Sequence, residues 1–428
     1  MSTIAYNCPC CGAPLTFSGV SGKLECAACG NSYDTEAIEA MNPAEIEYGP
    51  AFALPADTFD NEDAAGMQAY ICEGCGAELM TEGTTTATEC PYCGSPAILP
   101  ERIEGGVKPE KVIPFTVTKE QAQKQFEEYF KGKRLLPNVF LENRNRITEM
   151  RKLYVPYWLF DCDADANIVY DAEKEHTSRV GDWEITRTEH YVVRRKGSMA
   201  FDSIPVDGSE KLDNRITESL EPYDLKAAVD FSPAVLAGAM ADHVDVNAAE
   251  CEGRAMERVE NSVSQAMRET VSGYTNISER SKNIRTEGGK VTPVLMPVWL
   301  ITTEKEGTTY TFAINGQTGK LTCDVPADKK KSLVWGGGVF AGAFGVGTLA
   351  LWLLKQLGSG TLLIAAVLAA IIALIVVGRL TAQLKQAVHN DAAADYVRDG
   401  SFDLQVSYDR FLYETTKKRK IENGNQKK

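Results

Sequence analysis

The sequence predicts a multidomain protein built from two small zinc ribbons, a soluble α+β domain, and a C-terminal transmembrane helical hairpin followed by a cytoplasmic tail. Three observations lead to this prediction: cysteines paired at fixed spacing, a central region that mixes strand and helix patterns, and a long uncharged apolar zone. The chain has 428 residues and a hydrophobic content of 44%, enough for several domains and a real core. The expected segments are ribbon 1 (1–33), an acidic linker (34–70), ribbon 2 (71–100), the α+β domain (101–331), the hairpin (332–379) and the tail (380–428).

Eight of the twelve cysteines lie in four Cys-x-x-Cys-Gly knuckles. Four thiolates bind zinc tetrahedrally, and a glycine after the second cysteine permits the backbone angle that curls the chain around the sulfur. We therefore predict two Zn²⁺ ions per chain, with iron in a rubredoxin-like centre as the competing metal. Cys10, inside the first knuckle, is a competing ligand. The predicted ligands form two sets of equal spacing: Cys8, Cys11, Cys26 and Cys29, then Cys72, Cys75, Cys90 and Cys93.

The chain shows no sequence motif of an enzyme. A closed site of four cysteines leaves no position for a substrate or an activated water, so catalysis by these metals is disfavoured. The sequence has no Walker-type loop, no G-x-S-x-G elbow and no H-E-x-x-H motif. We expect a non-enzymatic protein with no catalytic residues and no cofactor-binding residues apart from the metal ligands.

The charge of the ribbons argues against a nucleic-acid partner. Lys23 is the one basic side chain in residues 1–33, residues 71–100 contain none, and the whole chain has a net charge of -14. Nucleic-acid binding draws on Lys and Arg to neutralise phosphates. The ribbons are therefore expected to contact protein or to serve a purely structural role.

Two uncharged apolar segments, residues 333–354 and 361–378, are each long enough to cross a bilayer as a helix. The core helices of soluble proteins keep a polar stripe, and these segments have none. A short break, "KQLGSG", separates them, so we predict a two-span hairpin in the cell membrane. The Gly338-x-x-x-Gly342 motif favours close packing, either against the second span or against another subunit in a homo-oligomer.

Basic residues flank the predicted hairpin on one side. Residues 329–331 are all lysine, Arg379 and Lys385 follow the second span, and the turn holds only Lys355. The positive-inside rule then places both termini in the cytoplasm. The first residues do not resemble a signal peptide, and paired cysteines in the reducing cytosol are typical of metal ligands.

Residues 101–331 mix strands and helices. Strands are predicted at "KVIPFTV", "LYVPYWLFDCDADANIVYDA", "WEITRTEHYVVRRKGSMAF" and "VTPVLMPVWLITTEKEGTTYTFAINGQTGKLT". Capping boxes at Thr118/Gln121 and Asn247/Glu250 begin two helices, the second of which should run to about Ser272. In the tail, "SFDLQVSYDRFLYE" is a candidate strand pair, and in the linker one helical turn is expected near residues 36–41.

Two further patterns leave alternatives open. "YVPYWLFD" (154–161) and "LMPVWLIT" (295–302) share Pro, one residue, Trp and Leu, which indicates either two related halves or a coincidence of strand composition. Trp158 and Trp299 are expected to anchor the core. The basic cluster at residues 417–420 either touches anionic lipid headgroups or forms a solvated terminus, and its distance along the chain from the second span favours the latter.

The motifs "YNCPCCGAPLTF", "TTTATECPYCGSPAIL", "KVIPFTV", "YVPYWLFD", "SGYTNI" and "AINGQTGKL", followed by the apolar hairpin, resemble an uncharacterised family of Gram-positive bacterial membrane proteins with an N-terminal double zinc ribbon. Its members are often labelled as carrying a transcription-initiation-factor-type zinc ribbon or as primosomal helicase-like. The resemblance covers nearly the whole chain. It implies zinc, membrane attachment and no established activity, and it supports the same eight cysteines as ligands. The chain has no nucleotide-binding loop to support the helicase label.

These features together predict a membrane-anchored zinc-ribbon adaptor that recruits a cytoplasmic protein partner to the membrane. Two ribbons on an acidic tether would gain avidity through effective concentration. The alternative is a membrane-tethered regulator that binds nucleic acid through its zinc ribbons.

Overall fold

A computed structural model of the chain describes residues 6–18, 21–41, 52–55, 59, 67–82, 89–96, 98–101, 107–138, 140, 150–305, 308–356, 358–384 and 387–420. The helices are α1 (Thr35–Ala40), α3 (Lys119–Phe130), α5 (Asn214–Ser219), α6 (Ala248–Glu269), α7 (Lys329–Leu353) and α8 (Ser359–Ala382), with short 3-10 turns η2 (Leu225–Ala227), η3 (Pro233–Leu236) and η4 (Ala394–Tyr396). The strands are β1 (Thr16–Ser18), β2 (Lys23–Glu25), β3 (Ser32–Tyr33), β4 (Met67–Cys72), β5 (Glu78–Glu82), β6 (Ile98–Glu101), β7 (Lys111–Val112), β8 (Arg151–Val180), β9 (Trp183–Asp207), β10 (Val229–Asp230), β11 (Met240–Asp242), β12 (Asn276–Lys305), β13 (Thr308–Asn315), β14 (Leu321–Cys323) and β15 (Asp403–Lys420).

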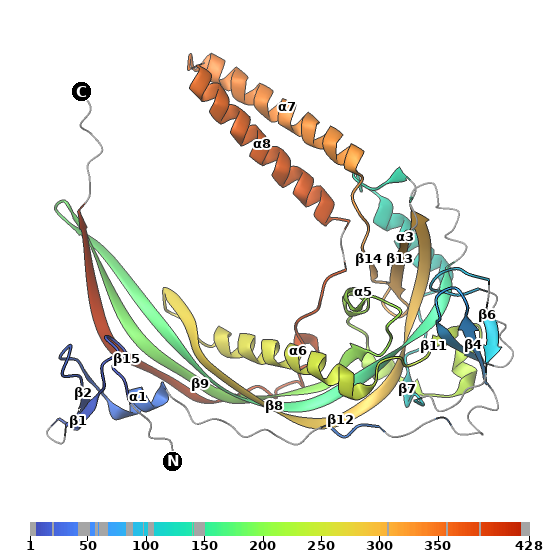
Figure 1. The fold of residues 1–428 in the computed structure, drawn as a ribbon, viewed down its shortest axis with the longest axis horizontal. Coiled ribbons are helices and arrows are strands. Elements are labelled where there is room, and N and C mark those ends of the chain that lie inside the picture. The colour runs from blue at the N-terminus through green and yellow to red at the C-terminus, as the bar shows by residue number, and fades with distance from the viewer. Residues whose placement is uncertain are drawn as a thin grey trace.

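One sheet of twelve strands forms the body of the molecule. Its longest strands, β8 and β12, have 30 residues each, which corresponds to roughly 100 Å of extended chain. They pair antiparallel with each other, β9 pairs with the other edge of β8, and β15 pairs with β9. The long strands curve into an arc whose concave side holds α6 (Figure 1).

Side chains of β8 alternate between two packed faces. Even-numbered residues such as Phe160 and Ile168 pack against the apolar stripe of α6, which includes Ala255 and Val259. Farther out along the same strand, odd-numbered Val169 faces ribbon 1 instead. Toward its end at Val180, β8 becomes exposed, so the outer part of the sheet forms an arm that is packed against ribbon 1 at Val169 and exposed at its tip.

The two sequence segments that resemble each other pair with one another at the centre of the sheet. In the antiparallel register of β8 and β12, Pro156 lies opposite Leu295 and Tyr154 lies opposite Pro297. The third residue of each segment therefore faces the first residue of the other. A local two-fold rotation axis perpendicular to this strand pair therefore relates the two segments.

The same hydrogen bonds occur on both sides of this axis. The indole of Trp158 donates to the carbonyl of Val246 at 2.8 Å, and the indole of Trp299 donates to the carbonyl of Val117 at 3.0 Å. Each valine immediately precedes the N-cap of a helix that has a capping box, α6 and α3 respectively. Both tryptophans are buried, as expected of core anchors.

The turns after β9 and β13 repeat as well. The N–H of Gly208 donates to the carbonyl of Pro156 at 2.9 Å, and the N–H of Gly316 donates to that of Pro297 at 2.8 Å. A Cβ at Gly316 would come within 2.6 Å of Phe115, so this turn requires glycine, and a Cβ at Gly208 would lie 3.2 Å from the indole of Trp158, a tight contact. The resemblance between the segments thus reflects two structurally related halves and not chance.

The two halves, β7–α3–β8–β9 and β11–α6–β12–β13, are interleaved. Strand β7 of the first half runs parallel to β12 of the second, and β11 of the second runs parallel to β8 of the first. Each half therefore places its first strand and its helix on the central strand of the other half. The capping boxes predicted for α3 and α6 are both present.

Several elements differ from the sequence prediction. The large sheet crosses the expected boundaries near residues 100 and 331, because β5 of ribbon 2 pairs with β11 and β15 of the tail pairs with β9. The tail segment predicted as a strand pair is the single strand β15, since β9 supplies its partner. Within the expected flexible linker, α1 forms the predicted helical turn, and Phe52 packs in the core beside Phe160.

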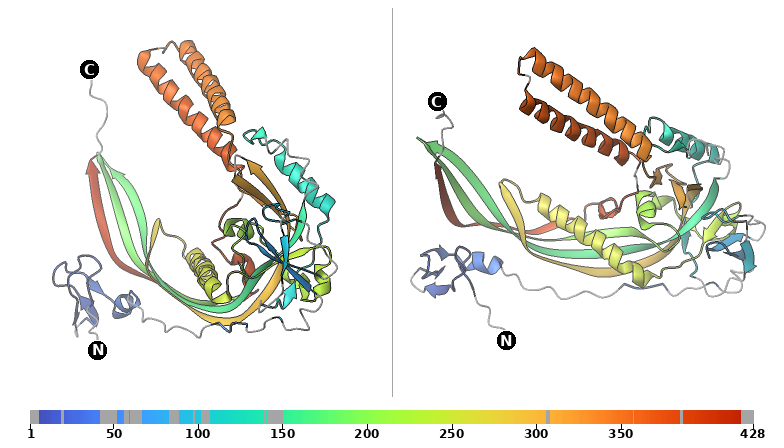
Figure 2. Two further views of the ribbon diagram at one scale, coloured as in Figure 1. Left: turned by 45° about the vertical axis from the view of Figure 1, so that its right-hand side comes forward. Right: turned by 45° about the horizontal axis from the view of Figure 1, so that its top comes forward.

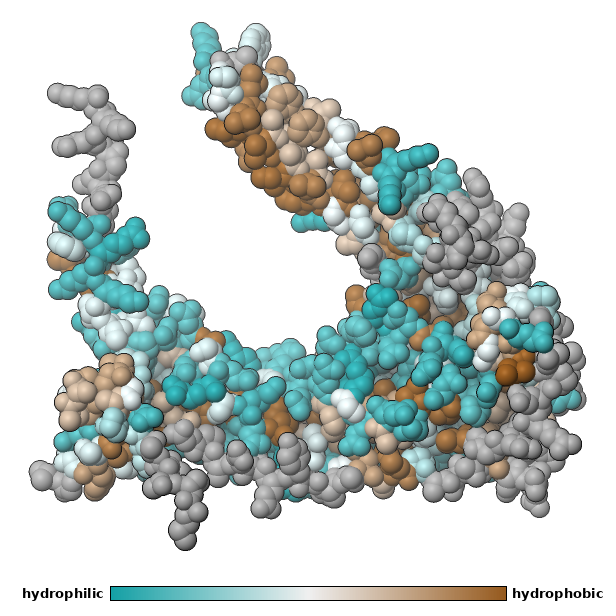
Figure 3. Space-filling model, in the orientation of Figure 1, coloured by the Kyte–Doolittle hydropathy of each residue, from teal (hydrophilic) through white to brown (hydrophobic). Residues whose placement is uncertain are grey.

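Two helices, α7 and α8, are long and apolar enough to cross a membrane. They coincide with the two uncharged segments identified in the sequence and lie side by side (Figures 1 and 2). Their surface is largely apolar, in contrast to the mostly hydrophilic concave side of the sheet (Figure 3). Lys385, which contributed to the predicted orientation, lies outside the described residues.

Candidate metal centres

Tight backbone turns shape all four knuckles. The N–H of Gly12 donates to the carbonyl of Cys8 at 2.8 Å, and the N–H of Gly76 donates to the carbonyl of Cys72 at 2.7 Å. The corresponding glycines of the other two knuckles make the same bond. All four glycines have positive φ, between 68° and 75°, although a Cβ would meet no atom within 4 Å. Glycine is therefore required here by its backbone angle and not by crowding.

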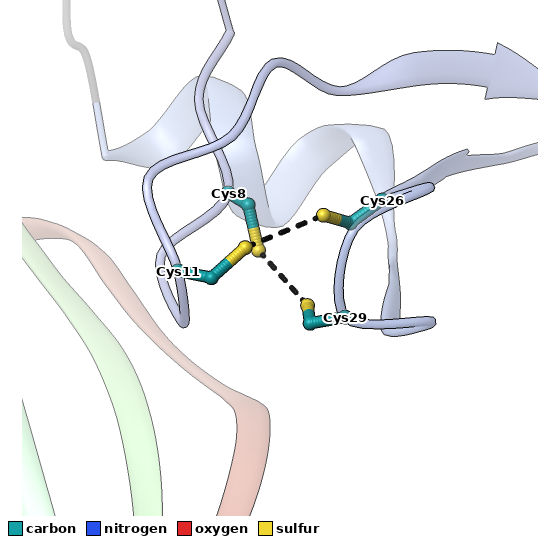
Figure 4. Close-up of side chains that lie close together, drawn as sticks. All are labelled: Cys8, Cys11, Cys26 and Cys29. Carbon is teal, nitrogen blue, oxygen red and sulfur yellow. Dashed lines mark hydrogen bonds between the residues drawn. The ribbon is translucent and has the colours of Figure 1, made fainter.

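Ribbon 1 brings Cys8, Cys11, Cys26 and Cys29 together beside the small β1–β2–β3 sheet (Figure 4). The Sγ atoms of Cys8 and Cys29 are 3.6 Å apart, and those of Cys11 and Cys26 are 3.5 Å apart. All four Sγ atoms lie within 4.8 Å of one another. Sulfurs about 2.3 Å from a tetrahedral zinc ion are separated by about 3.8 Å, so the cluster fits such an ion closely.

Ribbon 2 repeats this geometry with Cys72, Cys75, Cys90 and Cys93. The Sγ atoms of Cys72 and Cys93 are 3.6 Å apart, as are those of Cys75 and Cys90. The two sets predicted from spacing are thus the two sets that the structure assembles. Cys10 is exposed and belongs to neither cluster, and the remaining cysteines, Cys162, Cys251 and Cys323, are buried thiols.

The electrostatics of the clusters favour a bound cation. Burial opposes ionisation of Cys72, but hydrogen bonds from the backbone N–H groups of Cys75 and Gly74, together with those from the thiols of Cys93 and Cys90, lower the pKa of this thiol to about 7. Burial raises the pKa of Cys75 to about 11. Four close thiolates repel one another, and a divalent cation removes that repulsion while it displaces the remaining protons. The chain therefore has two groups of four cysteines, each of which could bind a metal ion. Their geometry is consistent with zinc.

Ribbon 1 is attached to the outer part of the large sheet. Buried Leu24 of ribbon 1 and Ile38 of the following helix α1 belong to one apolar cluster with Val169 of β8, Val192 of β9 and Leu412 of β15. The hydroxyl of Tyr413 also donates to the carbonyl of Pro9, at 3.4 Å. Ribbon 1 therefore lies against the convex side of the arm (Figure 1).

Ribbon 2 is part of the large sheet itself. Its strand β5 pairs with β11, and Arg151 at the start of β8 donates to the carbonyl of Cys90 at 2.8 Å and pairs with Glu89. Tyr92, which lies between the clustered Cys90 and Cys93 in the sequence, donates its hydroxyl hydrogen to buried Asp242. The sequence did not indicate these supporting residues, because their partners come from segments far along the chain.

The clusters and the fold together define a class of protein: a large mixed sheet that carries two four-cysteine clusters near its N-terminus and two apolar helices long enough to span a membrane. The chain is 34% identical over 341 residues to the Uncharacterized protein YdjG of Bacillus subtilis (strain 168), an alignment that covers 80% of this chain and 95% of that relative. The chain therefore belongs to the same family as YdjG. No family model and no solved structure matches the chain.

Proposed function

We propose that this protein is a non-enzymatic, membrane-anchored zinc-ribbon adaptor that recruits a cytoplasmic protein partner to the membrane. The observation that carries the proposal is the placement of two closed four-cysteine clusters on one continuous sheet, to which the apolar helices are also attached. Zinc bound by four thiolates has no open coordination position, so its contribution is the folding of each ribbon. The ribbons are then rigid surfaces for a partner.

The exposed surfaces of α7 and α8 support the membrane anchor. In the most apolar window of each helix, 0% and 11% of the residues are buried, in contrast to a core helix of a soluble protein. Lysines at the start of α7 and Arg379 near the end of α8 lie at the same end of the helix pair. This charge distribution favours a two-span anchor with both chain termini in the cytoplasm.

The base of the helix pair is fixed to the sheet domain. Lys331 donates to the carbonyl of Leu136 at 2.6 Å, and the guanidinium of Arg134 lies 4.6 Å from the ring centroid of Trp335. Tyr129 of α3 donates to the carbonyl of Leu384, just after α8, at 3.1 Å. An anchor held at both ends in this way would keep the sheet domain, and with it both ribbons, close to the bilayer.

The ribbons act differently in this proposal from ribbons on a flexible tether. Because ribbon 2 shares a sheet with the body and ribbon 1 packs on its arm, their separation is fixed by the fold. Two contact sites at a fixed separation favour a partner with two matching sites, or a partner made of several identical subunits. Once one ribbon has bound a partner, the effective concentration of the second ribbon is then set by the fixed distance between the ribbons and not by the length of a flexible linker.

The alternative function, a nucleic-acid-binding regulator, has little support from charge. The basic side chain of ribbon 1, Lys23, lies 3.2 Å from the carboxylate of Asp34 and is thereby partly neutralised. A gel-shift experiment at low salt with the detergent-solubilised protein tests this alternative, and retardation of DNA or RNA that depends on intact ribbons would favour it.

Affinity purification from detergent-solubilised membranes tests the adaptor proposal. Cys72→Ser plus Cys75→Ser should remove one metal ion and the proteins that ribbon 2 binds, whereas Cys10→Ser, a change of an exposed non-ligand cysteine, should retain both ions and every partner. Metal content by mass spectrometry and partner content by proteomics are measured on the same samples. A partner set that the double substitution leaves unchanged would contradict recruitment through ribbon 2.

A further inference from the structure

The far end of the long arm is an exposed turn that no other described element covers. Strands β8 and β9 are joined there by Gly181 and Asp182, and Val180 pairs with Trp183 across the turn. Val180 is 62% exposed and Trp183 is 46% exposed. This cross-strand pair stabilises the hairpin end locally, but much of both apolar side chains stays in contact with solvent.

A basic strand end lies beside this turn. In the register of β15 and β9, Lys420 lies opposite Trp183 and Lys418 lies opposite Ile185. Arg419 is near Glu184, at 4.0 Å, whereas Lys417, Lys418 and Lys420 form no ion pair with the residues that the structure describes. The lysines are exposed, and together with Arg179 and Arg419 they outnumber the acidic side chains of the tip, Asp182 and Glu184, although the net charge of the chain is -14.

An exposed tryptophan beside lysines without ion-pair partners among the described residues is a combination that suits the surface of an anionic membrane. Tryptophan favours the water–hydrocarbon boundary of a membrane because one end of its ring system is apolar and the other carries an N–H donor. Clusters of lysine near such a boundary are attracted to anionic lipid headgroups. The basic cluster, which the sequence alone favoured as a solvated terminus, is brought to this position by the pairing of β15 with β9.

The arc of the sheet directs the tip to one side of the molecule. In all three ribbon views the end of the arm and the α7/α8 pair project from the same, concave side of the sheet (Figures 1 and 2). A bilayer that holds α7 and α8 therefore lies on the side toward which the arm curves. The strand pairs that carry the tip, β8 with β9 and β9 with β15, are continuous to the turn.

We propose that this arm tip, defined as Val180, Trp183 and the basic residues 417–420, docks on anionic phospholipid headgroups of the membrane in which α7 and α8 are anchored. The inference rests on the membrane anchor of the proposed function and adds a second, reversible contact with the lipid surface. Trp183 and Val180 enter the headgroup region, and the lysines contact lipid phosphates. The sheet then spans the membrane surface between two contacts, with ribbon 1 held on its outer side.

Photocrosslinking of the full chain in lipid nanodiscs tests the docking. Benzoylphenylalanine is introduced at Trp183 or, as a control, at Phe17, which is 62% exposed on ribbon 1. The nanodiscs contain phosphatidylcholine with or without phosphatidylglycerol, and lipid adducts are measured by mass spectrometry. We expect adducts at Trp183 that increase with phosphatidylglycerol and are rare at Phe17.

Charge reversal provides the second arm of the experiment. Lys417→Glu, Lys418→Glu and Lys420→Glu together should lower the lipid adduct at Trp183 at least about five-fold at low salt, the effect expected of losing even one lysine near an anionic surface. The matched control has the same charge change at exposed lysines elsewhere: Lys124→Glu, Lys131→Glu and Lys226→Glu. The control should leave the adduct unchanged.

The outcomes separate the docking from the membrane anchor. A chain that enters nanodiscs but gives equal adducts at Trp183 and Phe17, or adducts independent of phosphatidylglycerol, would overturn the docking alone. Crosslinks from Trp183 to an acidic protein in cells, in place of lipid, would also overturn it. A chain that does not enter nanodiscs would remove the anchor, and the docking with it.

Discussion

Asp207 and Asn315 occupy matching positions in the two halves, at the ends of β9 and β13. Each accepts a backbone N–H two residues ahead, from Ser209 at 2.9 Å and from Gln317 at 2.8 Å. Both side chains are buried, but only one of them can ionise. Burial raises the pKa of Asp207 to about 8, and the nearby carboxylate of Asp242 adds to the rise.

We predict that Asp207→Asn stabilises the folded protein by an amount that grows with pH. The folded pKa lies above the value of about 4 in an unfolded chain, so folding retains a proton that the unfolded chain releases. The stability that this proton provides is complete below about pH 4 and is lost as the pH rises through about 8. Thermal unfolding in detergent across this range measures the effect, with exposed Asp399→Asn as the control. A variant whose stability falls as steeply with pH as that of the wild type would exclude Asp207 as the titrating group.

At the residue scale, local spacing was enough to predict which cysteines form the two clusters. The geometry of a knuckle depends on residues within a few positions, so the eight cysteines could be predicted without knowledge of the fold. Asp207 could not be predicted, because its burial depends on α5 and on Asp242, which lie elsewhere in the sequence. The same holds for Tyr33, whose hydroxyl lies 3.2 Å from the Sγ of Cys8.

At the element scale, a buried ion pair fastens the segment that follows α8 to the sheet domain. Arg258 of α6 pairs with Glu221 at 2.6 Å, and their side chains are 0% and 1% exposed. Arg258 also donates to the carbonyl of Ala392 at 3.2 Å, and Glu221 accepts from Tyr396 at 2.9 Å and from Asn390 at 3.2 Å. These contacts hold the chain between the apolar helix pair and β15.

We predict that Arg258→Ala destabilises the protein by about 3–5 kcal/mol, because it leaves the Glu221 carboxylate buried without a partner. Replacement of both residues, Arg258→Met with Glu221→Gln, should restore part of the loss. The control is Arg280→Ala, which removes a partly exposed pair with Asp171 and should cost about 1 kcal/mol or less. Thermal unfolding, combined with proteolysis of the segment after α8, measures both effects. Equal losses for Arg258→Ala and Arg280→Ala would contradict the fastening role.

Helices and strands differed in how well the sequence predicted them. The capping boxes located α3 and α6 correctly, since a helix start depends on local hydrogen bonds, although α6 ends at Glu269, slightly before the expected Ser272. Strand β12 begins at Asn276, well before the predicted strand at residue 291. Residues 276–290 are mostly polar, so pairing with β8, and not an apolar pattern, makes this segment a strand.

At the scale of the whole molecule, the two four-cysteine clusters lie in units that are attached to the sheet in different ways. Ribbon 1 contacts the arm through an apolar cluster, whereas ribbon 2 contributes β4, β5 and β6 to the sheet. Ribbon 1 forms a small sheet of its own that is too small to fold on core burial alone, so we expect removal of a bound metal to unfold it. Ribbon 2 shares the large sheet and its apolar core, so it should lose only part of its order. The large core between β8 and α6 contains no metal ligand and is independent of this loss.

We predict that a zinc chelator abolishes hydrogen-exchange protection in β1–β3 and lowers it in β4–β6, while β8 and α6 stay protected. Protection of β11 should fall in part, because it pairs with β5. Hydrogen exchange of the detergent-solubilised protein with and without chelator measures the effect, and Cys10→Ser should respond like the wild type. Unchanged protection of both ribbons after the metal has left would show that the ribbons fold without it.

The sequence predicted which elements the molecule contains better than it predicted how the strands pair. Ribbons, apolar helices and most strands follow from local patterns, but the single sheet depends on pairings between distant segments, such as β5 with β11 and β15 with β9. The resemblance between residues 154–161 and 295–302 suggested related halves. It did not reveal that each half completes the other.

The interleaving of the halves has a consequence for synthesis on the ribosome. Helix α3 emerges early, yet Trp299 and β12, against which it packs, are translated only after α6. During much of translation the aromatic face of α3 is therefore exposed, because the strand on which it packs has not yet been made. Contacts between segments so far apart in the sequence form late, and the exposed apolar face is a binding site for chaperones. A ribosome-stalled fragment that ends before β12 would consequently be a better chaperone client than the finished protein.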